Sequence, residues 1–409
     1  MTHGRSEPIE RHPDSGQTRD LIAGYCARDN LSTHDPYDIW QTRAGFHVKY
    51  LYHCHPALGL LPAALLTAYD TWINNRLRLF YPCREYPSVR SLAALALLNL
   101  YRATADRQYL SWAGRHLSWL QEHRCQGYAG ACWGLGFDYP VRKDLIYAGN
   151  TPFSTVTPYA LEAFCRYSCV ASTDEYVDTI RSIHTFLEQD LQVMWETERH
   201  LATSYAARRD RIAFNSVAYT MYSYALLRDY VDAAARDRAA EKIRKLYAYL
   251  CDHQGADGSW FYSPDGESFI DCFHSCFVLK NMIKTNTLIP LAGCASVIEK
   301  GYGYLRRVFR DSRTGLFRRF SVANKPGLVK FDLYDNAELL NLAVLRDDRD
   351  FARELTHHIA RHFVRSGQGI YSKIDCLNGK RDLNTLRWAV MPYLYALSEL
   401  LVHEVQQWS

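Results

Sequence analysis

Apolar and polar residues recur along most of the chain with the period of amphipathic helices. From about residue 55 onward, apolar positions return every three to four residues, in blocks separated by connectors. This pattern predicts helices near residues 55–79, 89–103, 107–123, 154–170, 174–192, 213–230, 234–252, 269–285, 288–307, 331–345, 349–364 and 384–406. Strand signal is confined to one hairpin near residues 308–320, where the segment SRTG supplies the turn.

The connectors between these helices alternate between short and long. The long ones are rich in Gly, Pro and aromatic residues, and the helices that follow them begin near residues 89, 154, 213, 269, 331 and 384. The spacing of about 55–65 residues indicates repeated helical hairpins. Six hairpins can close into a double-layered ring, so we expect an all-α (α/α)6 toroid whose long connectors carry function on one face. An open solenoid is the alternative.

The ends and the domain boundaries follow from the same pattern. Residues 1–36 are polar and show little periodicity, so we expect a flexible lead-in followed by a single toroid domain over residues 37–409. The lead-in lacks the apolar core of a secretory signal. No apolar run approaches the roughly 18 residues that indicate a transmembrane helix.

One short motif supports the ring. The segment AYLCDHQGADGSW, residues 248–260, resembles the Q-x-x-D-G-S-W repeat of the α/α-toroid superfamily that contains squalene–hopene cyclases and protein prenyltransferases. The resemblance implies that Gln254 caps a helix end, Gly258 makes the turn and Trp260 packs on the next helix. The acidic D-x-D-D motif of proton-initiated cyclases is absent from the sequence, which argues against that chemistry.

Composition narrows the classes of function. The 48 basic and 44 acidic residues nearly balance, which excludes a dedicated nucleic-acid-binding protein. The 12 cysteines are scattered without a C-x-x-C pair, as expected of free thiols in the cytoplasm. Cys272, His274 and Cys276 suggest a metal site, but on a helix His274 points away from the two cysteines. We therefore expect neither a metal nor another cofactor.

Polar residues at the starts of the predicted inner helices converge on one rim of the ring. Five are of the types that cap helix N-termini: Thr155, Asn215, Asp271, Asp332 and Asn384. Capping does not account for His274, Asp335 and Arg387, which follow one turn later on the same faces. We expect this rim to be the mouth of a central cavity and the functional surface.

Four residues of this rim are candidates for proton transfer. Asp271 and His274 are three apart on one helix face, where a carboxylate orients an imidazole and raises its basicity. A hydrogen-bonded structural histidine is the alternative. Asp332 and Asp335 form a second acidic pair, and Asp138 lies in a glycine-rich loop. Two acids across a cavity suit glycosidic cleavage, so we expect Asp138, Asp271, His274 and Asp335 to be catalytic.

Aromatic and basic residues indicate the substrate class. Trp133, Phe137 and Tyr139 of the loop over residues 127–144 can stack on a sugar ring, or can pack that loop. Arginines cluster in residues 207–211 and at Arg306, Arg307, Arg310, Arg313, Arg318 and Arg319. Guanidinium groups bind carboxylates and phosphates, which suggests a uronate-bearing glycan or a lipid-linked sugar phosphate. A solvated charged face is the alternative.

Several segments together resemble a bacterial family encoded in exopolysaccharide-biosynthesis loci. They are Gly134 to Asp138, Asn215, Gly258–Trp260, Asp271–Leu279 and Arg387–Trp388, within a resemblance that spans residues 80–402. The chain departs from the family pattern at Cys272, Cys276 and Pro392. The family is similar to (α/α)6 carbohydrate-active enzymes, including the helical domain of glucuronyl C5-epimerases, and so implies a role in polysaccharide biosynthesis.

Three hypotheses follow for function. The first is an enzyme that hydrolyses, eliminates or epimerises an anionic glycan, with substrate bound by Trp133, Tyr139, Asn215, Trp260, Asp332, Arg387 and Trp388. The second is a non-catalytic glycan-binding component of a polysaccharide synthesis complex. The third is an isoprenoid-handling toroid. The expected partners are a glycan or lipid-linked sugar and that complex, without nucleic acid.

Overall fold

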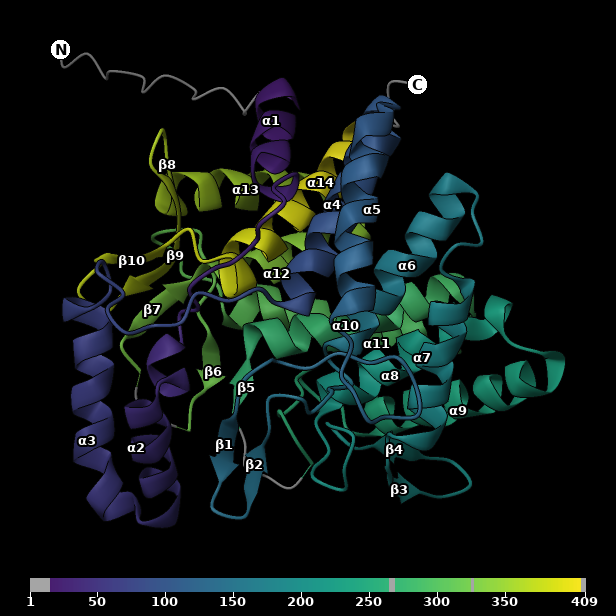
Figure 1. Ribbon diagram of the computed structural model, residues 1–409, viewed down its shortest axis with the longest axis horizontal. Helices are drawn as coiled ribbons and strands as arrows, with labels where there is room; N and C mark the ends of the chain where they lie inside the picture. Colours follow the sequence, from purple (N-terminus) through teal and green to yellow (C-terminus); the bar gives the residue numbers. More distant parts are fainter. Residues whose placement is uncertain (1–14, 265–268, 325–326, 406–409) are drawn as a thin grey trace.

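The inner layer of the fold is a closed ring of six helices. The computed structural model describes residues 15–264, 269–324 and 327–405. Each inner helix contacts the next around the ring, and the last contacts the first (Figure 1). Nearly all of their side chains are buried, because other helices cover them on several sides. The inner helices are α4 (Pro87–Thr104), α6 (Thr157–Ala171), α8 (Phe214–Leu227), α10 (Cys272–Leu288), α12 (Leu333–Leu345) and α14 (Met391–Val405).

Six outer helices cover this ring. Each buries one face only; in α13, for example, Phe351, Leu355 and Ile359 are buried at four-residue spacing. Short connectors lead from an inner helix to its outer partner, and long connectors lead on to the next inner helix. The predicted (α/α)6 toroid is confirmed. The outer helices are α5 (Arg107–Glu122), α7 (Val177–Gln189), α9 (Ala233–Asp252), α11 (Cys294–Val308), α13 (Arg349–Phe363) and α1 (Ser15–Cys26).

The two ends of the chain supply the sixth pair of helices. α1 packs against α14 and α4 and buries Ile22, Tyr25 and Cys26. The sequence pattern assigns this outer position to residues 55–79 and predicts a flexible lead-in over residues 1–36. The structure instead places a helix over Ser15–Cys26, while residues 1–14 lie outside the described part. The apolar pattern of α1 is weak, because only its last turns touch the ring.

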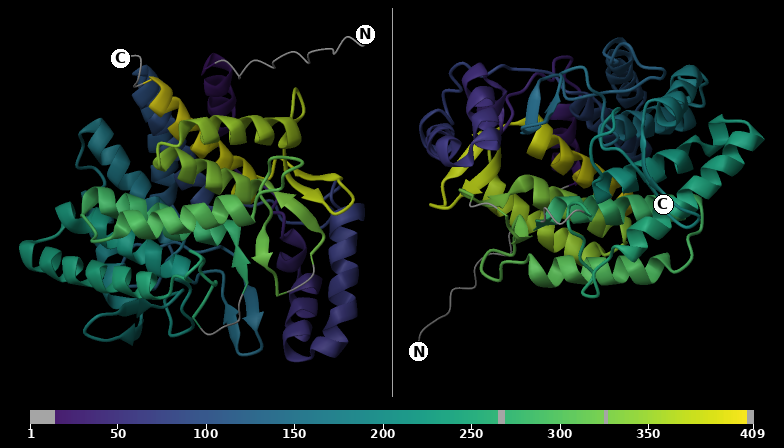
Figure 2. Two further views of the ribbon diagram at one scale, coloured as in Figure 1. Left: turned by 180° about the vertical axis from the view of Figure 1, so that it is seen from behind. Right: turned by 90° about the horizontal axis from the view of Figure 1, so that it is seen from below.

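A helical hairpin lies outside the ring. It comprises α2 (Arg43–Cys54) and α3 (Pro56–Ala68) and projects at one edge of the molecule (Figure 2). The helix predicted over residues 55–79 ends at Ala68 and continues as a single π-helical turn, Tyr69–Ile73. Among the described helices, none is long and apolar enough to cross a membrane.

The described strands all lie in the long connectors. The predicted hairpin at residues 308–320 is reduced to one bridge between Arg310 and Phe317, around the turn at Gly315. Strand structure elsewhere in the connectors was not expected from the sequence. The strands are β1 (Tyr139–Arg142), β2 (Leu145–Tyr147), β3 (Val193–Glu196), β4 (Leu201–Thr203), β5 (Ile270–Asp271), β6 (Phe320–Val322), β7 (Val329–Asp332), β8 (Val364–Arg365), β9 (Gly369–Asp375) and β10 (Lys380–Leu383). Among the described strands, β1 pairs with β2, β3 with β4, β5 with β6, and β9 with β7, β8 and β10, all antiparallel.

For the QxxDGSW segment, the structure confirms two of the three roles that the resemblance implies. Gly258 has a φ of 97°, and a Cβ there would lie 2.3 Å from the carbonyl oxygen of Lys300. Trp260 packs against Gly301 of α11. Gln254 does not cap its own helix; its amide donates to the carbonyl oxygen of Val297 in α11, at 3.0 Å.

Two of the five expected N-caps are formed. Asp271 accepts the backbone N–H of His274 at the start of α10, and Asp332 accepts that of Tyr334 at the start of α12. The starts of α6 and α8 have no side-chain cap from Thr155 or Asn215. Asn384 accepts hydrogen bonds from Tyr25 and from the backbone of Ile370 instead, which ties α1 to the last connector.

Candidate functional site

A histidine and an aspartate form a hydrogen-bonded pair at the start of α10. The imidazole Nδ1 of His274 lies 2.7 Å from one carboxylate oxygen of Asp271 and 2.9 Å from the other. The same carboxylate caps the helix, so its position is held by the backbone as well. Asp271 is buried, whereas the side chain of His274 is 20% exposed. Among the described residues the Nε2 atom has no hydrogen-bond partner and remains available to a ligand.

An arginine that has no carboxylate partner contacts the same aromatic ring as this histidine. The guanidinium carbon of Arg211 lies 4.3 Å from the ring centre of Tyr205 and 5.4 Å from that of Tyr262. The imidazole of His274 lies 4.6 Å from the ring centre of the same Tyr262. Within the described residues, the Arg211 side chain makes no ion pair, and its buried Nε has no hydrogen-bond partner. Arg211 and His274 thus both contact the ring of Tyr262, one with an unpaired guanidinium and the other with a free imidazole nitrogen.

A small pocket joins α8 to α10 beneath these groups. Asn215, Tyr262, Asp271 and His274 line it together with Trp260. Asn215 is the second residue of α8, and its buried Oδ1 has no hydrogen-bond partner among the described residues. The structure therefore brings the predicted residues Asn215, Asp271 and His274 to one place.

The second predicted acidic pair is occupied by structural contacts. Asp332 caps α12 and forms an ion pair with Arg319 at 3.2 Å. Asp335 is completely buried and accepts the backbone N–H of Phe273 at 3.1 Å, which fastens α12 to α10. Burial raises the pKa of Asp335 well above its usual range, and burial also raises that of Asp332. Neither carboxyl is placed like the open pair that glycosidic cleavage requires.

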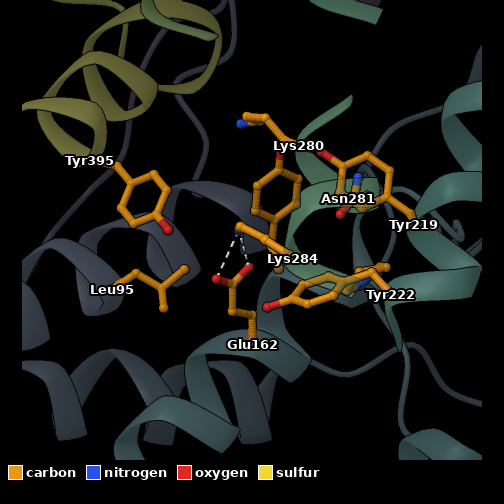
Figure 3. A pocket seen from close by; sticks show the side chains of 10 residues that line it. Leu95, Glu162, Tyr219, Tyr222, Lys280, Asn281, Lys284 and Tyr395 are labelled. Atoms are coloured by element: carbon orange, nitrogen blue, oxygen red, sulfur yellow. Dashed lines mark hydrogen bonds and ion pairs between the residues drawn. The ribbon is translucent and has the colours of Figure 1, made fainter. Parts of the chain in front are cut away.

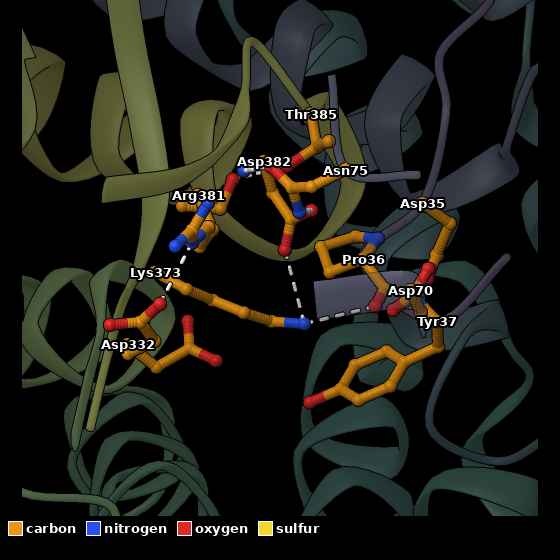
Figure 4. A network of polar contacts seen from close by, with 12 residues as sticks. Asp35, Pro36, Tyr37, Asp70, Asn75, Asp332, Lys373, Arg381, Asp382 and Thr385 are labelled. Carbon is orange, nitrogen blue, oxygen red and sulfur yellow. Dashed lines mark hydrogen bonds and ion pairs between the residues drawn. The ribbon is translucent and has the colours of Figure 1, made fainter. Parts of the chain in front are cut away.

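The arginine predicted near the end of the chain is also paired. Arg387 donates to Asp35 at 2.7 Å, and both side chains are buried. Close by, Lys373 of β9 reaches the backbone carbonyl of Pro36 at 2.9 Å and the carboxylate of Asp382 at 3.2 Å (Figure 4). These contacts hold the N-terminal segment across the last connector.

Trp388 remains partly exposed beside Arg387. Its ring packs edge-on against Tyr334 at 4.9 Å and Tyr37 at 5.9 Å. Its indole nitrogen has no hydrogen-bond partner among the described residues. Of the three tryptophans predicted to bind substrate, Trp388 is the one that is not buried.

Trp133 and Trp260 lie in the core and not at the mouth. Both are buried, and their indole N–H groups donate to the last turns of α5 and α9, at Leu120 (2.8 Å) and Leu250 (2.9 Å). They occupy equivalent places in two repeats, where each satisfies a carbonyl at a helix C-terminus. Trp133 therefore offers no ring face to a sugar, whereas Trp260, although buried, borders the small pocket lined by Asp271 and His274.

The glycine-rich loop places its remaining candidates at the edge of the mouth. Asp138 is exposed and accepts the backbone N–H of Gly149 at 2.9 Å. Tyr139 begins β1, and the ammonium group of Lys49 from α2 lies 3.6 Å from its ring centre. Tyr139 interacts electrostatically with Arg211 and Tyr262, which places it near the Asp271–His274 pair.

Aromatic side chains separate this mouth from a polar interior. Tyr219, Phe273, Phe277 and Tyr334 form a cluster distinct from the main core, with Tyr159 and Trp388 against it. Deeper along the inner helices, Glu162 and Lys284 meet at 2.8 Å between Tyr222 and Tyr395 (Figure 3). This inner cavity has room for about one water molecule.

No metal-binding cluster is evident in the described part of the chain. No group of three or more His, Cys, Asp or Glu side chains there is arranged to hold an ion. Cys272 and Cys276 are buried in α10, where burial raises the pKa of both thiols. All twelve cysteines are free thiols.

Two site residues were missed by the sequence reasoning. Arg211 was only part of the basic run over residues 207–211, and Tyr262 was not singled out. Arg211 immediately precedes the apolar run of α8, as the other rim residues precede theirs, and that position was the available signal.

Comparison with known proteins supports the fold. No family model matches the chain, and no curated protein matches it in sequence. The cellobiose 2-epimerase of Spirochaeta thermophila is similar in structure, with a TM-score of 0.59 and 12% identity over 86% of this chain and 98% of that one. A family 76 α-mannanase of Bacteroides thetaiotaomicron has a TM-score of 0.57 and 11% identity, over 92% and 100%. A polysaccharide lyase has a TM-score of 0.54 and 10% identity, over 89% and 98%.

Proposed function

We propose that the chain is a carbohydrate-active enzyme that removes a proton from an anionic sugar, as an epimerase or a lyase acting on a uronate-bearing glycan. The observation that carries the proposal is that His274, held by Asp271 and with its Nε2 free, contacts the same ring, that of Tyr262, as the unpaired guanidinium of Arg211. The toroids of known structure with the same fold include epimerases, hydrolases and a lyase, which is consistent with carbohydrate chemistry.

The geometry suits abstraction of the proton next to a uronate carboxylate. Arg211 binds the carboxylate through two parallel hydrogen bonds and withdraws its negative charge. His274 Nε2 then takes the proton from C5, and Asp271 stabilises the imidazolium that forms. The electrons of the broken C–H bond pass into the carboxylate as an enolate-like charge beside Arg211. Return of a proton from solvent to the opposite face inverts C5. In elimination the C5 electrons form the C4=C5 double bond as the C4–O4 bond breaks, and the departing oxygen takes a proton from the His274 imidazolium or from water, which gives an unsaturated product.

The acids of the mouth make hydrolysis the weaker candidate. Glycoside hydrolases of the common type need two carboxyl groups that flank the scissile bond. Here Asp271 is bound to His274, Asp332 to Arg319, and Asp335 to the backbone of Phe273. Asp138 does not line the pocket of the Asp271–His274 pair, and Asp335, whose Oδ2 has no partner among the described residues, is completely buried. The accessible group in that pocket is an imidazole, which is suited to moving a proton at carbon.

The proposal is tested with purified polysaccharides of differing uronate content in deuterated water. Epimerisation incorporates deuterium at C5, elimination produces an unsaturated sugar, and hydrolysis adds the mass of water. We expect deuterium or an unsaturated product, and a loss of about 10²–10⁴-fold in rate for His274→Gln.

The matched control is His123→Gln, at an exposed histidine at the end of α5. This variant should keep the wild-type rate. Unchanged turnover in His274→Gln would refute the role of the histidine. Binding of a uronate polysaccharide without any turnover by the wild type would favour a non-catalytic glycan-binding component instead.

We further propose that the enzyme acts in the cytoplasm in the biosynthesis of a bacterial surface polysaccharide, in association with the synthesis complex. The resemblance of Asp271–Leu279 and Arg387–Trp388 to the exopolysaccharide family supports this assignment. The free thiols are typical of a reducing compartment. Deletion of the gene should alter the uronate composition or the amount of the polymer, and an unchanged polymer would contradict it.

A further inference from the structure

The α3 helix exposes an apolar surface at the edge of the molecule. Leu58, Leu61 and Leu65 are 67%, 67% and 62% exposed, and their spacing places them on one side of α3. Leu60 is exposed beside them, and Phe80, after the π-helical turn, is 93% exposed. Exposed leucines and phenylalanine in one contiguous segment indicate a surface that is covered by a partner.

The charge of the same segment identifies the kind of partner. Between residues 39 and 84 the sequence has a single acidic residue, Asp70, and its side chain is buried against Tyr81. Arg43, His47 and Arg76 are exposed. An apolar surface that carries only positive charge is complementary to an anionic one and repels a basic one.

The length and polarity of α3 indicate a lipid surface. No charged residue occurs between Pro56 and Tyr69, so the helix is apolar on its exposed sides as well as on the side that packs on α2. With 13 residues, α3 is too short to span a bilayer but long enough to lie in its interface. Trp72, partly exposed after α3, is of the type that favours the headgroup region.

We propose that the hairpin of α2 and α3, with the turn that follows to Phe80, binds the surface of an anionic lipid bilayer. The leucines of α3 and Phe80 enter the boundary between headgroups and acyl chains. Arg43 and Arg76 contact lipid phosphates. The docking is peripheral and reversible, because one short apolar helix with a few basic residues supplies only modest affinity.

The position of the hairpin relates this surface to the mouth of the ring. α2 contacts β1, and Lys49 lies against Tyr139 at the edge of the mouth. In both side views the α2–α3, β1–β2 and β3–β4 hairpins project on the same side of the molecule (Figures 1 and 2). Docking of this hairpin therefore brings the edge of the mouth close to the bilayer, as a lipid-linked glycan requires. That consequence rests on the proposed function, whereas lipid binding itself does not.

Co-sedimentation with vesicles tests the proposal on the full chain. We expect binding to vesicles of phosphatidylcholine mixed equally with phosphatidylglycerol, and much weaker binding to phosphatidylcholine alone. The double variant Leu61→Asp/Leu65→Asp should lose at least about tenfold in partition. Arg43→Gln and Arg76→Gln should each lose about fivefold, and raised salt should weaken wild-type binding.

The matched control is Leu288→Asp, an exposed leucine at the C-terminal end of α10, which should bind like the wild type. Thermal unfolding of all variants checks that the fold is kept. Equal binding of wild type and double variant would overturn the proposal, and so would equal binding to neutral and anionic vesicles. A wild-type dimer that becomes monomeric in the double variant, without vesicle binding, would assign the surface to self-association.

Discussion

The ring contains two groups of charged side chains along its axis, and they differ in how completely they are paired. In the interior, Lys280 pairs with Glu338, Lys284 with Glu162, and Arg166 with both Glu162 and Glu399. At the mouth, His274 has one free nitrogen and Arg211 has no carboxylate partner within the described residues.

This difference in pairing distinguishes charges that stabilise the fold from charges that are available to bind a ligand. The interior charges are paired because Glu162, Glu338 and Glu399 are buried among the inner helices, where an unpaired charge would be costly. His274 and Arg211 are only partly buried, so their unpaired groups can be solvated in the free protein or can bind a ligand. Three variants test this contrast. The first breaks the interior pair of Lys280 and Glu338, the second is compared with the wild type over a range of pH, and the third removes the unpaired cation at the mouth.

Removing one partner of the interior pair should give the largest effect. Glu338→Leu leaves the ammonium group of Lys280 buried with only Asn341 as a hydrogen-bond acceptor. We expect a loss of about 3–5 kcal/mol in the free energy of unfolding, measured by urea denaturation. The double variant Lys280→Met/Glu338→Leu should recover most of it. If the single variant is as stable as the wild type, the interior pairs do not neutralise each other as described.

Lowering the pH should reduce the free energy of unfolding, because Glu399 becomes protonated. Burial opposes its ionisation, but Arg166 and Asn99 outweigh burial and lower the pKa of Glu399 from 4.5 to about 2. Because the folded pKa is below the unfolded value, this stabilisation is present above about pH 4.5 and is lost as pH falls toward 2.

The shift corresponds to about 3 kcal/mol. We therefore expect the stability of Glu399→Gln to fall less steeply than that of the wild type between pH 5 and about 2. Chemical denaturation at several pH values measures the difference. Parallel curves would show that Glu399 is not the group responsible.

The smallest of these effects is expected at the mouth and concerns binding. Arg211→Gln breaks no ion pair and removes only the contacts of the guanidinium with the rings of Tyr205 and Tyr262, so the free energy of unfolding should change by no more than about 1 kcal/mol. KM for a uronate substrate should rise about tenfold or more, since a charge-assisted contact is lost. Arg209→Gln, at an exposed arginine two residues earlier, is the control and should leave KM unchanged. A large loss of stability in Arg211→Gln would place this arginine with the structural charges.

Local spacing was enough to predict part of the site. The pairing of Asp271 with His274 follows from their separation of three residues at a helix start, because helix geometry alone brings such residues together. The contacts of Arg211 with Tyr262 could not be foreseen, since the two residues lie in different connectors. The reverse holds for Trp133 and Trp260, whose aromatic character suggested a sugar site but whose indoles close helix ends in the core.

The amino-acid sequence by itself determined the toroid, because the 3.6-residue period and the alternation of connector lengths are local properties of the chain. It also determined which ends of the inner helices carry polar side chains. Only the tertiary structure decided that α1, and not residues 55–79, closes the ring. It likewise decided which charges are neutralised and which stay free. Pairing depends on distances between residues far apart in the chain, and no local pattern encodes those distances.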